Sequence, residues 1–324
     1  MWRLVMFLRE RPTLRAAAPI AVCVAAFLLV TLVQFGETRS ILLAGSIQSS
    51  DHLDRTLLYA NGTNYSLGDG VMLSMVRIPA GEFEMGSRNA GNGIIGIDEG
   101  PLHHVAITHD FEMSQFEITR AVFGRVMGWG RLDGGADKPV TGIDFDHICL
   151  FCNKLSERFG LQKCYSGSGQ NVVCDFSANG FRLPTEAEWE YACRAGTTSL
   201  YCTGDDAFGK CERGRPAFLV CVGWFKNNSN GRIHSVGELA PNAFGLYDMH
   251  GNAWEMCWDF YDEHYYASSP AKDPRGPEKG TQRVVRGGCY QSNREDCRSA
   301  SRGWIWPGRN GKTVGFRVVR TASK

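Results

Sequence analysis

The sequence predicts a single α+β domain with little regular secondary structure, preceded by one transmembrane helix. Glycine is abundant, at 38 residues, and aromatic side chains make up 11% of the chain, which is typical of irregular backbone packed around large rings. Short strand-like runs alternate with glycine and proline, and few segments have helical periodicity. A long apolar stretch lies near the N-terminus.

That apolar stretch, residues 16–35, reads AAAPIAVCVAAFLLVTLVQF and is long enough to cross a hydrocarbon core as a helix. Residues 1–15 contain several arginines, which the positive-inside rule keeps in the cytoplasm. We therefore expect a single-pass membrane protein whose main domain is periplasmic or extracellular. A cleaved signal peptide is the alternative, and it exports the main domain as well.

The exported part divides into a linker and one domain. Residues 36–70 have mixed polarity and no sustained period, so we expect a linker there. Residues 71–320 have the texture of one α+β domain. Inside it, Thr119 is a candidate N-cap for a first helix, and a second helix is predicted over residues 146–159, with Gly160 following it.

A third helix is predicted from the run Thr185-Glu186-Ala187-Glu188, which is a capping box. Thr185 accepts a hydrogen bond from the Glu188 amide while the Glu188 side chain reaches back. We expect the other glutamates of this helix, Glu186 and Glu190, to face solvent or to pair locally. Gly196 ends the helix.

Charge and composition exclude several classes of function. The 35 Lys and Arg residues nearly balance the 34 Asp and Glu residues, which leaves a formal charge of +1. A nucleic-acid-binding protein usually carries a basic face, so we expect no nucleic-acid partner. The 43% apolar and 21% charged content is that of a globular protein rather than a disordered or fibrous one.

The cysteines are interpreted through export, because disulfides persist in oxidising compartments. Cys164 and Cys174 bracket one hairpin-like loop, and Cys202 and Cys211 bracket another, so we predict a disulfide across each, with buried unbonded thiols as the alternative. Of the 12 cysteines, Cys23 lies in the membrane segment, which leaves an odd number outside. At least one exported thiol is then free or paired with another molecule.

Several long blocks resemble one known family. They are MVRIPAGEFEMGS, EGPLHHVAI, FEMSQFEITRAVF, GFRLPTEAEWEYACRAG, PNAFGLYDMHGNAWEMCWDF, RVVRGGCY and GFRVVR. Their order and unusual composition are similar to the signature blocks of the formylglycine-generating enzymes, or sulfatase-modifying factors. The resemblance covers residues 71–320 and implies an irregular C-type-lectin-like fold.

The resemblance also implies a reaction. Members of the family oxidise a cysteine of a sulfatase to formylglycine with oxygen and a copper(I) ion held by two thiolates, which are matching ligands for a soft ion. We therefore expect Cu⁺ as a cofactor if the activity is retained. The expected partner is a cysteine-containing sulfatase-like peptide or another exported protein.

The copper segment departs from the family pattern. Counting forward from Gly287-Gly288 places Ser292 at the first copper position and Cys297 at the second. Counting backward from Arg302, the segment is three residues short, and Cys297 is then no ligand. Cys289, which replaces the motif serine, is a third candidate. The candidate catalytic residues are Cys297, Cys289 and Ser292, and the alternative is that both cysteines are small buried residues.

The calcium site of the family matches this sequence more closely than its copper site does. The family binds Ca²⁺ through a D/N-x-x-G-x-A-x-E run, which Asp248, Gly251, Ala253 and Glu255 match here. Carboxylates and backbone carbonyls from one tight turn are hard oxygen ligands suited to Ca²⁺.

Two functions follow from the resemblance. In one, a groove along residues 287–302 takes an extended peptide and the enzyme oxidises its cysteine. In the other, the same lectin-like surface binds a peptide or a glycan without chemistry. The candidate binding residues offer aromatic area and planar cations; they are Tyr290, Arg302, Trp304, Trp306 and Arg309.

Overall fold

The computed structural model describes residues 62–93, 95–129, 134–212, 217–309 and 311–322, together with the backbone of two N-terminal strands. Those strands are β1 (Leu32–Gln34) and β2 (Glu37–Arg39). The predicted transmembrane segment spans residues 16–35. Its residues 16–31 lie outside the described part of the chain, and residues 32–34 form β1. Within the described parts of the chain, every helix is too short or too polar to cross a bilayer.

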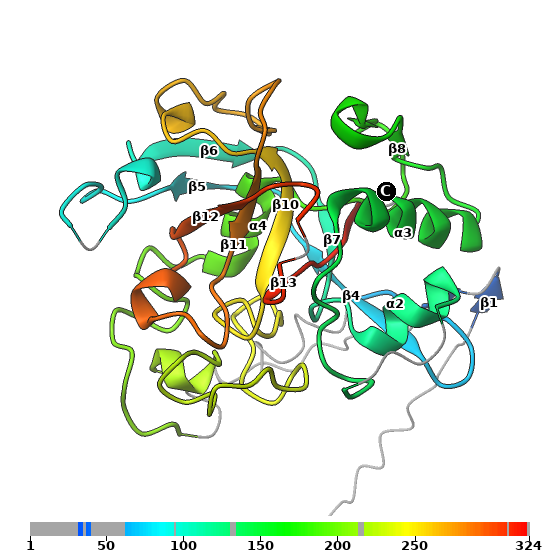
Figure 1. The fold of residues 1–324 in the computed structure, drawn as a ribbon, viewed down its shortest axis with the longest axis horizontal. Coiled ribbons are helices and arrows are strands. Elements are labelled where there is room, and N and C mark those ends of the chain that lie inside the picture. Colours follow the sequence, from blue (N-terminus) through cyan, green and yellow to red (C-terminus); the bar gives the residue numbers. More distant parts are fainter. Residues whose placement is uncertain are drawn as a thin grey trace, which may run out of the picture.

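The two ends of the domain meet in a six-stranded antiparallel sheet (Figure 1). The strand order is β1-β2-β3-β4-β7-β14. Beyond the first two strands, the members are β3 (Asn64–Ser66), β4 (Met72–Ile78), β7 (Phe111–Ser114) and β14 (Val319–Thr321). Because β14 pairs with β7, the last described strand lies beside a strand that is about 200 residues earlier in the chain.

Strands from the C-terminal part of the chain form a second, four-stranded sheet. Its order is β12-β11-β10-β13, and β10 pairs in parallel with β13 and antiparallel with β11. The members are β10 (Trp254–Phe260), β11 (Arg283–Arg286), β12 (Arg302–Ile305) and β13 (Val314–Gly315). Two hairpins complete the strands, β5 (Gly81–Met85) with β6 (His103–Ile107), and β8 (Tyr165–Ser166) with β9 (Val173–Cys174).

The remaining regular structure is short helix. Five 3₁₀ turns are present in the described residues: η1 (Ile97–Glu99), η2 (Gly169–Asn171), η3 (Leu219–Cys221), η4 (Tyr265–Ala267) and η5 (Arg294–Cys297). The α-helices are α2 (Arg120–Met127), α3 (Phe145–Arg158) and α4 (Glu186–Arg194). An α+β fold with few helices and mixed sheets confirms this part of the sequence prediction.

Each α-helix begins where its local signals predict. Thr119 caps α2 by accepting from the Val122 amide, and α3 begins one residue earlier than predicted because Asp144 is its N-cap. Gly160, just after α3, has a φ of 67°, the left-handed conformation expected of a residue that ends a helix. The capping box between Thr185 and Glu188 is present at the start of α4.

Helix α4 lies at the centre of the molecule, between the β5–β6 hairpin and the four-stranded sheet (Figure 1). All nine of its residues are buried. Its apolar side chains, among them Trp189 and Ala192, belong to a core cluster with β4, β6 and β7. A second cluster packs α2 and α3, and a third, smaller cluster surrounds Leu219 and Phe225.

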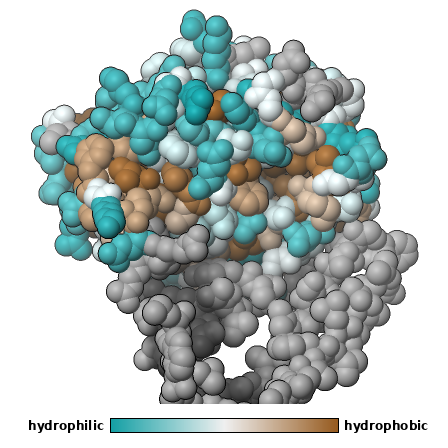
Figure 2. Space-filling model, turned by 90° about the horizontal axis from the view of Figure 1, so that it is seen from below, coloured by the Kyte–Doolittle hydropathy of each residue, from teal (hydrophilic) through white to brown (hydrophobic). Residues whose placement is uncertain are grey.

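The surface retains apolar area. Figure 2 shows hydrophobic residues gathered in a band across one face, between hydrophilic margins. The large hydrophobic side chains exposed in the described residues are Met72, Ile97, Trp129, Leu150, Val173, Leu200, Phe208, Trp304 and Trp306.

All three glutamates of α4 are buried, so the prediction that Glu186 and Glu190 face solvent is wrong. Local pairing, the other predicted outcome, is found for Glu190, whose partner Arg194 lies four residues along the helix. Each of the three pairs with a buried arginine. Glu186 holds Arg302 in a bidentate pair at 2.7 and 3.0 Å. Glu188 holds Arg182 at 2.7 Å through both oxygens.

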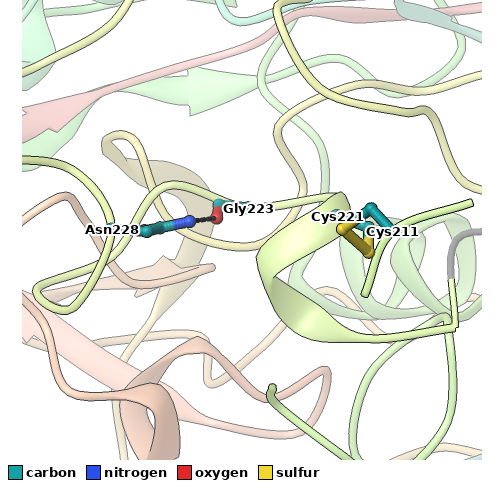
Figure 3. Close-up of a disulfide and its surroundings, with 4 residues drawn as sticks. All are labelled: Cys211, Cys221, Gly223 and Asn228. Carbon is teal, nitrogen blue, oxygen red and sulfur yellow. Dashed lines mark hydrogen bonds between the residues drawn. A yellow bond between two sulfur atoms is a disulfide. The ribbon is translucent and has the colours of Figure 1, made fainter. Parts of the chain in front are cut away.

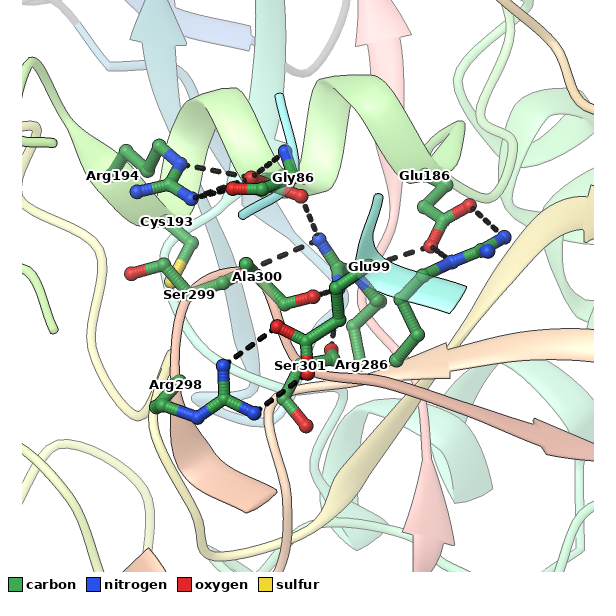
Figure 4. A network of polar contacts seen from close by, with 12 residues as sticks. Gly86, Glu99, Glu186, Cys193, Arg194, Arg286, Arg298, Ser299, Ala300 and Ser301 are labelled. Atoms are coloured by element: carbon green, nitrogen blue, oxygen red, sulfur yellow. Dashed lines mark hydrogen bonds and ion pairs between the residues drawn. The ribbon is translucent and has the colours of Figure 1, made fainter. Parts of the chain in front are cut away.

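Glu190 joins two arginines from different parts of the chain, Arg194 and Arg286, which are labelled in Figure 4. It pairs with Arg194, one helical turn along, and with Arg286 of β11, whose guanidinium also donates to the carbonyls of Ala300 and Ser301. Burial alone would raise the pKa of Glu186, but Arg302 and Arg286 outweigh it and that pKa falls below its usual value. Glu186 is therefore ionised and tightly paired.

Glu190→Gln is expected to lower the free energy of unfolding by about 3–5 kcal/mol, because two buried guanidiniums would then face a neutral amide. Urea unfolding of the full chain at pH 7 measures this. Asp110→Asn is the matched control, since its pair with Arg77 is exposed and should cost about 1 kcal/mol or less. A Glu190→Gln protein as stable as the control would contradict the account.

Candidate functional site

The segment after β11 places the candidate catalytic residues in a tight turn. Gly287 and Gly288 both have positive φ. After them, Cys289 turns back on Ser292, whose Oγ accepts from the Cys289 amide at 3.1 Å and lies 3.5 Å from the Cys289 Sγ. Ser292 thus serves the turn, and the chain continues into η5, which ends at Cys297.

Cys297 is inaccessible. Its side chain is fully buried in the third core cluster. A Cβ at Gly288 would lie 2.6 Å from the Cys297 Sγ, so only glycine allows the two segments to approach this closely. Burial, with a smaller contribution from Cys289, raises the pKa of the Cys297 thiol well above its usual range. Cys297 is therefore a neutral thiol.

These residues do not suit a copper(I) ion. The two family positions hold a serine oxygen, which is a hard donor, and a neutral buried thiol, whereas a soft ion needs thiolates. We therefore derive no oxidation step through copper.

His250, which no sequence pattern singled out, fixes the backbone around Cys297. Its Nε2 accepts from the Cys202 amide at 3.1 Å, so its Nδ1–H donates to the Cys297 carbonyl at 2.8 Å. The Cys193 Sγ lies 3.7 Å from the same Nε2. One imidazole thereby joins the loop at Cys202 to the end of η5.

Both predicted disulfides are wrong. The described bond joins Cys211 to Cys221 instead (Figure 3), while Cys202 is free and its backbone is held by His250. Cys164 and Cys174 are also free. In the β8–β9 hairpin the partner of Cys174 is Tyr165; because side chains alternate along a strand, Cys164 points to the opposite face.

Peptide mapping of the non-reduced full chain should recover the Cys211 and Cys221 peptides as one linked species. Cys164, Cys174 and Cys202 should react with an alkylating reagent after denaturation without a reductant, because they are thiols. A linked Cys164–Cys174 or Cys202–Cys211 species would contradict this pairing.

The predicted binding residues separate into two groups. Arg302 is buried, with its guanidinium between Glu186 and the Tyr266 ring. It therefore stabilises the fold, and its position does not support the prediction that it contacts a ligand. Trp304 and Trp306 are half exposed, with ring centroids 6.5 Å apart. Tyr290 is partly buried.

Arg309 is exposed, and its backbone amide donates to the Trp306 carbonyl at 2.9 Å. None of the predicted binding residues lines either of the two cavities that the structure forms near η5 and the β5–β6 hairpin. The concave surface was therefore missed by sequence reasoning, because its walls come from segments far apart in the chain.

The smaller cavity, of about 230 Å³, lies beside the residues that follow Cys297. Its wall consists of the β5–β6 hairpin, the loop after α4 and two residues beyond η5; the lining residues are Glu84, Gly86, Ser87, Arg88, Asn89, Ile95, Leu102, Arg194, Thr198, Ser199, Leu200, Asp205, Arg298 and Ala300. Cys289, Ser292 and Cys297 are not among them.

The larger cavity, of about 540 Å³, lies between the β5–β6 connection and η4. It is lined by Ser87, Arg88, Ala90, Ile97, Gly100, Pro101, Leu102, His264 and Ala267. Ser87, Arg88 and Leu102 line both cavities, so the two cavities adjoin at these residues. We call the two together the hairpin groove.

The predicted calcium residues lie in a buried acidic cluster with Glu117. Asp248 and Glu255 are its other carboxylates, and Arg317 is its nearby guanidinium. Burial raises the pKa of Asp248 to about 6, and burial with repulsion from Asp248 and Glu255 raises that of Glu117 well above its usual value. The cluster carries more carboxylates than cations.

Part of this cluster fits a hard cation. The Asp248 Oδ1 is buried and has no hydrogen-bond partner. Gly251 has a φ of 89°, and a Cβ there would lie 2.1 Å from the Trp224 carbonyl, so the predicted bend requires glycine. The Glu255 oxygens already accept hydrogen bonds from Arg317 and from the Trp189 indole. The Asp248 Oδ1 is therefore the carboxylate oxygen that is available to a cation.

The fold and these sites define a domain with few helices, mixed sheets and a central helix buried in ion pairs. Residues 69–322 match the model of the sulfatase-modifying factor enzyme 1-like domain. The chain belongs to this family, which confirms the resemblance seen in the sequence.

Relatives with different names share the domain. The chain is 31% identical over 284 residues to the formylglycine-generating enzyme of Streptomyces coelicolor, covering 76% of this chain and 89% of that one. It is 31% identical over 262 residues to the serine/threonine-protein kinase pkn1 of Chlamydia pneumoniae, covering 77% of this chain but only 38% of the kinase.

Among solved structures, Treponema denticola variable protein 1 is similar, with a TM-score of 0.68 and 27% identity. The match covers 81% of this chain and 99% of that one.

Proposed function

We propose that this chain is a peptide-binding member of the family that does not perform the copper-dependent oxidation. The observation that carries the proposal is the position of Cys297. The hairpin groove opens beside Arg298 and Ala300, yet the neighbouring thiol is fully buried and turned into the core. A ligand in this groove meets no exposed cysteine at either family copper position.

The shape and lining of the groove favour an extended peptide over a glycan. The two joined cavities offer room for several consecutive residues, and both signs of charge are present, in Glu84, Asp205 and Arg88. In the described lining there is no Trp, Tyr or Phe, the side chains that stack on sugar rings. Charged side chains with backbone between them are the features a peptide ligand would use.

The groove wall is rigid before any ligand binds. Arg298 is held by Glu99 through two bonds of 2.6 Å, and Arg194 by Glu190 at 2.8 Å. The Arg298–Glu99 pair joins the η5 side of the groove to the β5–β6 connection. The Arg194–Glu190 pair lies within α4, and Arg194 also donates to the Gly86 carbonyl at the end of β5. A preformed wall lowers the ordering cost of binding, which suits a binding role.

The location of this activity is part of the proposal. Residues 32–34 form β1, so a membrane anchor would have to end before them. If the apolar residues that precede β1 anchor the chain, the groove faces the periplasm or the cell exterior. Its ligand is then a segment of another exported protein.

Panning a phage-displayed library of short random peptides on the full chain in mild detergent tests peptide binding. Thr198 is exposed and lines the smaller cavity, so Thr198→Trp should fill the cavity and abolish enrichment over the background. Thr281→Trp, an equally exposed substitution outside both linings, is the control. No enrichment by the wild-type chain, or equal enrichment by Thr198→Trp, would refute the proposal.

We also propose a calcium ion at Asp248, with carbonyls of the turn at Gly251 and Ala253 and with Glu255 as the further candidate ligands. The unpartnered Asp248 oxygen and the surplus of buried carboxylates support it. A bound Ca²⁺ would supply the missing positive charge and stabilise the turn that precedes β10.

Calcium at about 100 times its Kd should stabilise the fold by about 2.7 kcal/mol, and a calcium chelator should lower the Tm accordingly. Asp248→Ala, which removes the ligand oxygen, should lose this calcium dependence, whereas Asp206→Ala, at an exposed position, should keep it. Magnesium at the same concentration should have little effect. A Tm that does not respond to the chelator in the wild-type chain would disprove the site.

A further inference from the structure

The hairpin groove has one charged side chain at its centre. Arg88 is exposed and lies in the wall that the two cavities share, with Ser87 and Leu102 beside it. A ligand that occupies both cavities therefore lies beside Arg88 in each of them. The identity of the ligand at that point is therefore set by what Arg88 can bind.

The other cations of the groove already have carboxylate partners. Arg194 pairs with Glu190 and Arg298 with Glu99, both in buried pairs. His264 lies 3.3 Å from Glu263. No carboxylate lies within ion-pair distance of Arg88 in the described residues, and no hydrogen bond of its side chain is seen there. Arg88 is thus the cation available to a ligand.

The acidic residues that line the groove do not neutralise the positive charge of Arg88. Glu84 lies 3.4 Å from His104, on the outer strand of the hairpin. Asp205 accepts the Leu200 amide at 2.8 Å and lines only the smaller cavity. The charge at the junction is therefore positive, and the negative charge lies further along one side.

The larger cavity is suited to an apolar side chain. Ala90, Pro101, Leu102 and Ala267 line it, and Ile97 is 66% exposed there. Covering this isoleucine and its neighbours would remove apolar surface from water, which favours binding.

We propose that the hairpin groove selects extended peptides that carry an Asp or Glu side chain at the junction, paired with Arg88, and an aliphatic side chain in the larger cavity. The inference rests on the proposed peptide-binding function and adds the chemical class of the ligand. A guanidinium accepts a carboxylate in a bidentate geometry, so the acidic residue would be positioned as well as attracted.

Sequencing the peptides enriched on the full chain and on its variants tests this. The wild-type chain should enrich peptides with an acidic residue at a constant spacing from an aliphatic one. Arg88→Glu should reverse the preference to Lys or Arg, and Arg88→Lys should keep it. For one enriched peptide, changing its acidic residue to the amide should weaken binding about five-fold, as expected for an exposed ion pair.

Asp205→Asn serves as the control, because it removes a charge from the same groove but not from the junction. It should leave the acidic preference intact. If the wild-type chain enriches peptides that Thr198→Trp does not, yet without acidic residues or with the same preference in Arg88→Glu, this inference fails while peptide binding stands. If the wild-type chain enriches nothing, the proposed function fails and this inference with it.

Discussion

The rest of the structure depends on the buried ion pairs of α4. A helix with three glutamates in nine residues would be expected at the surface, yet every residue of it is buried. The desolvation of these carboxylates is offset by guanidiniums from the loop before α4, from β11 and from β12. The loop-rich chain therefore has a charged centre in which ion pairs join α4 to the loop before it, to β11 and to β12. The hydrophobic clusters pack around this centre.

This centre also shapes the groove. Arg286 and Arg302 orient the strands that enter and leave the segment of Cys297, while Arg298 crosses to Glu99 in the β5–β6 connection. The same contacts that build one wall of the groove hold the Cys297 thiol in the core. The family scaffold here presents a rigid concave surface without a reactive thiol at its edge.

The features that the sequence predicted are those with local causes. Thr119, the Thr185–Glu188 capping box and the glycines after each helix act within a few residues, so the helices were located correctly. The partner of Glu190 could not be predicted, since Arg286 is 96 positions away. The Cys164–Cys174 disulfide failed because it depends on strand register, and the hairpin groove was missed because no single segment contains it. Glu117 and His250 gave no sequence signal, since their roles arise from burial.

We propose that this chain does not perform the copper oxidation of the family, because a serine occupies one copper position and a fully buried thiol the other. The most direct measurement is the mass of a Cys-x-Pro-x-Arg peptide after incubation with the full chain, copper(I) and oxygen, with a formylglycine-generating enzyme as the positive control. An unchanged cysteine in the presence of this chain, alongside conversion by the control, is the predicted result. Conversion by this chain that is lost in Cys297→Ser would contradict the claim.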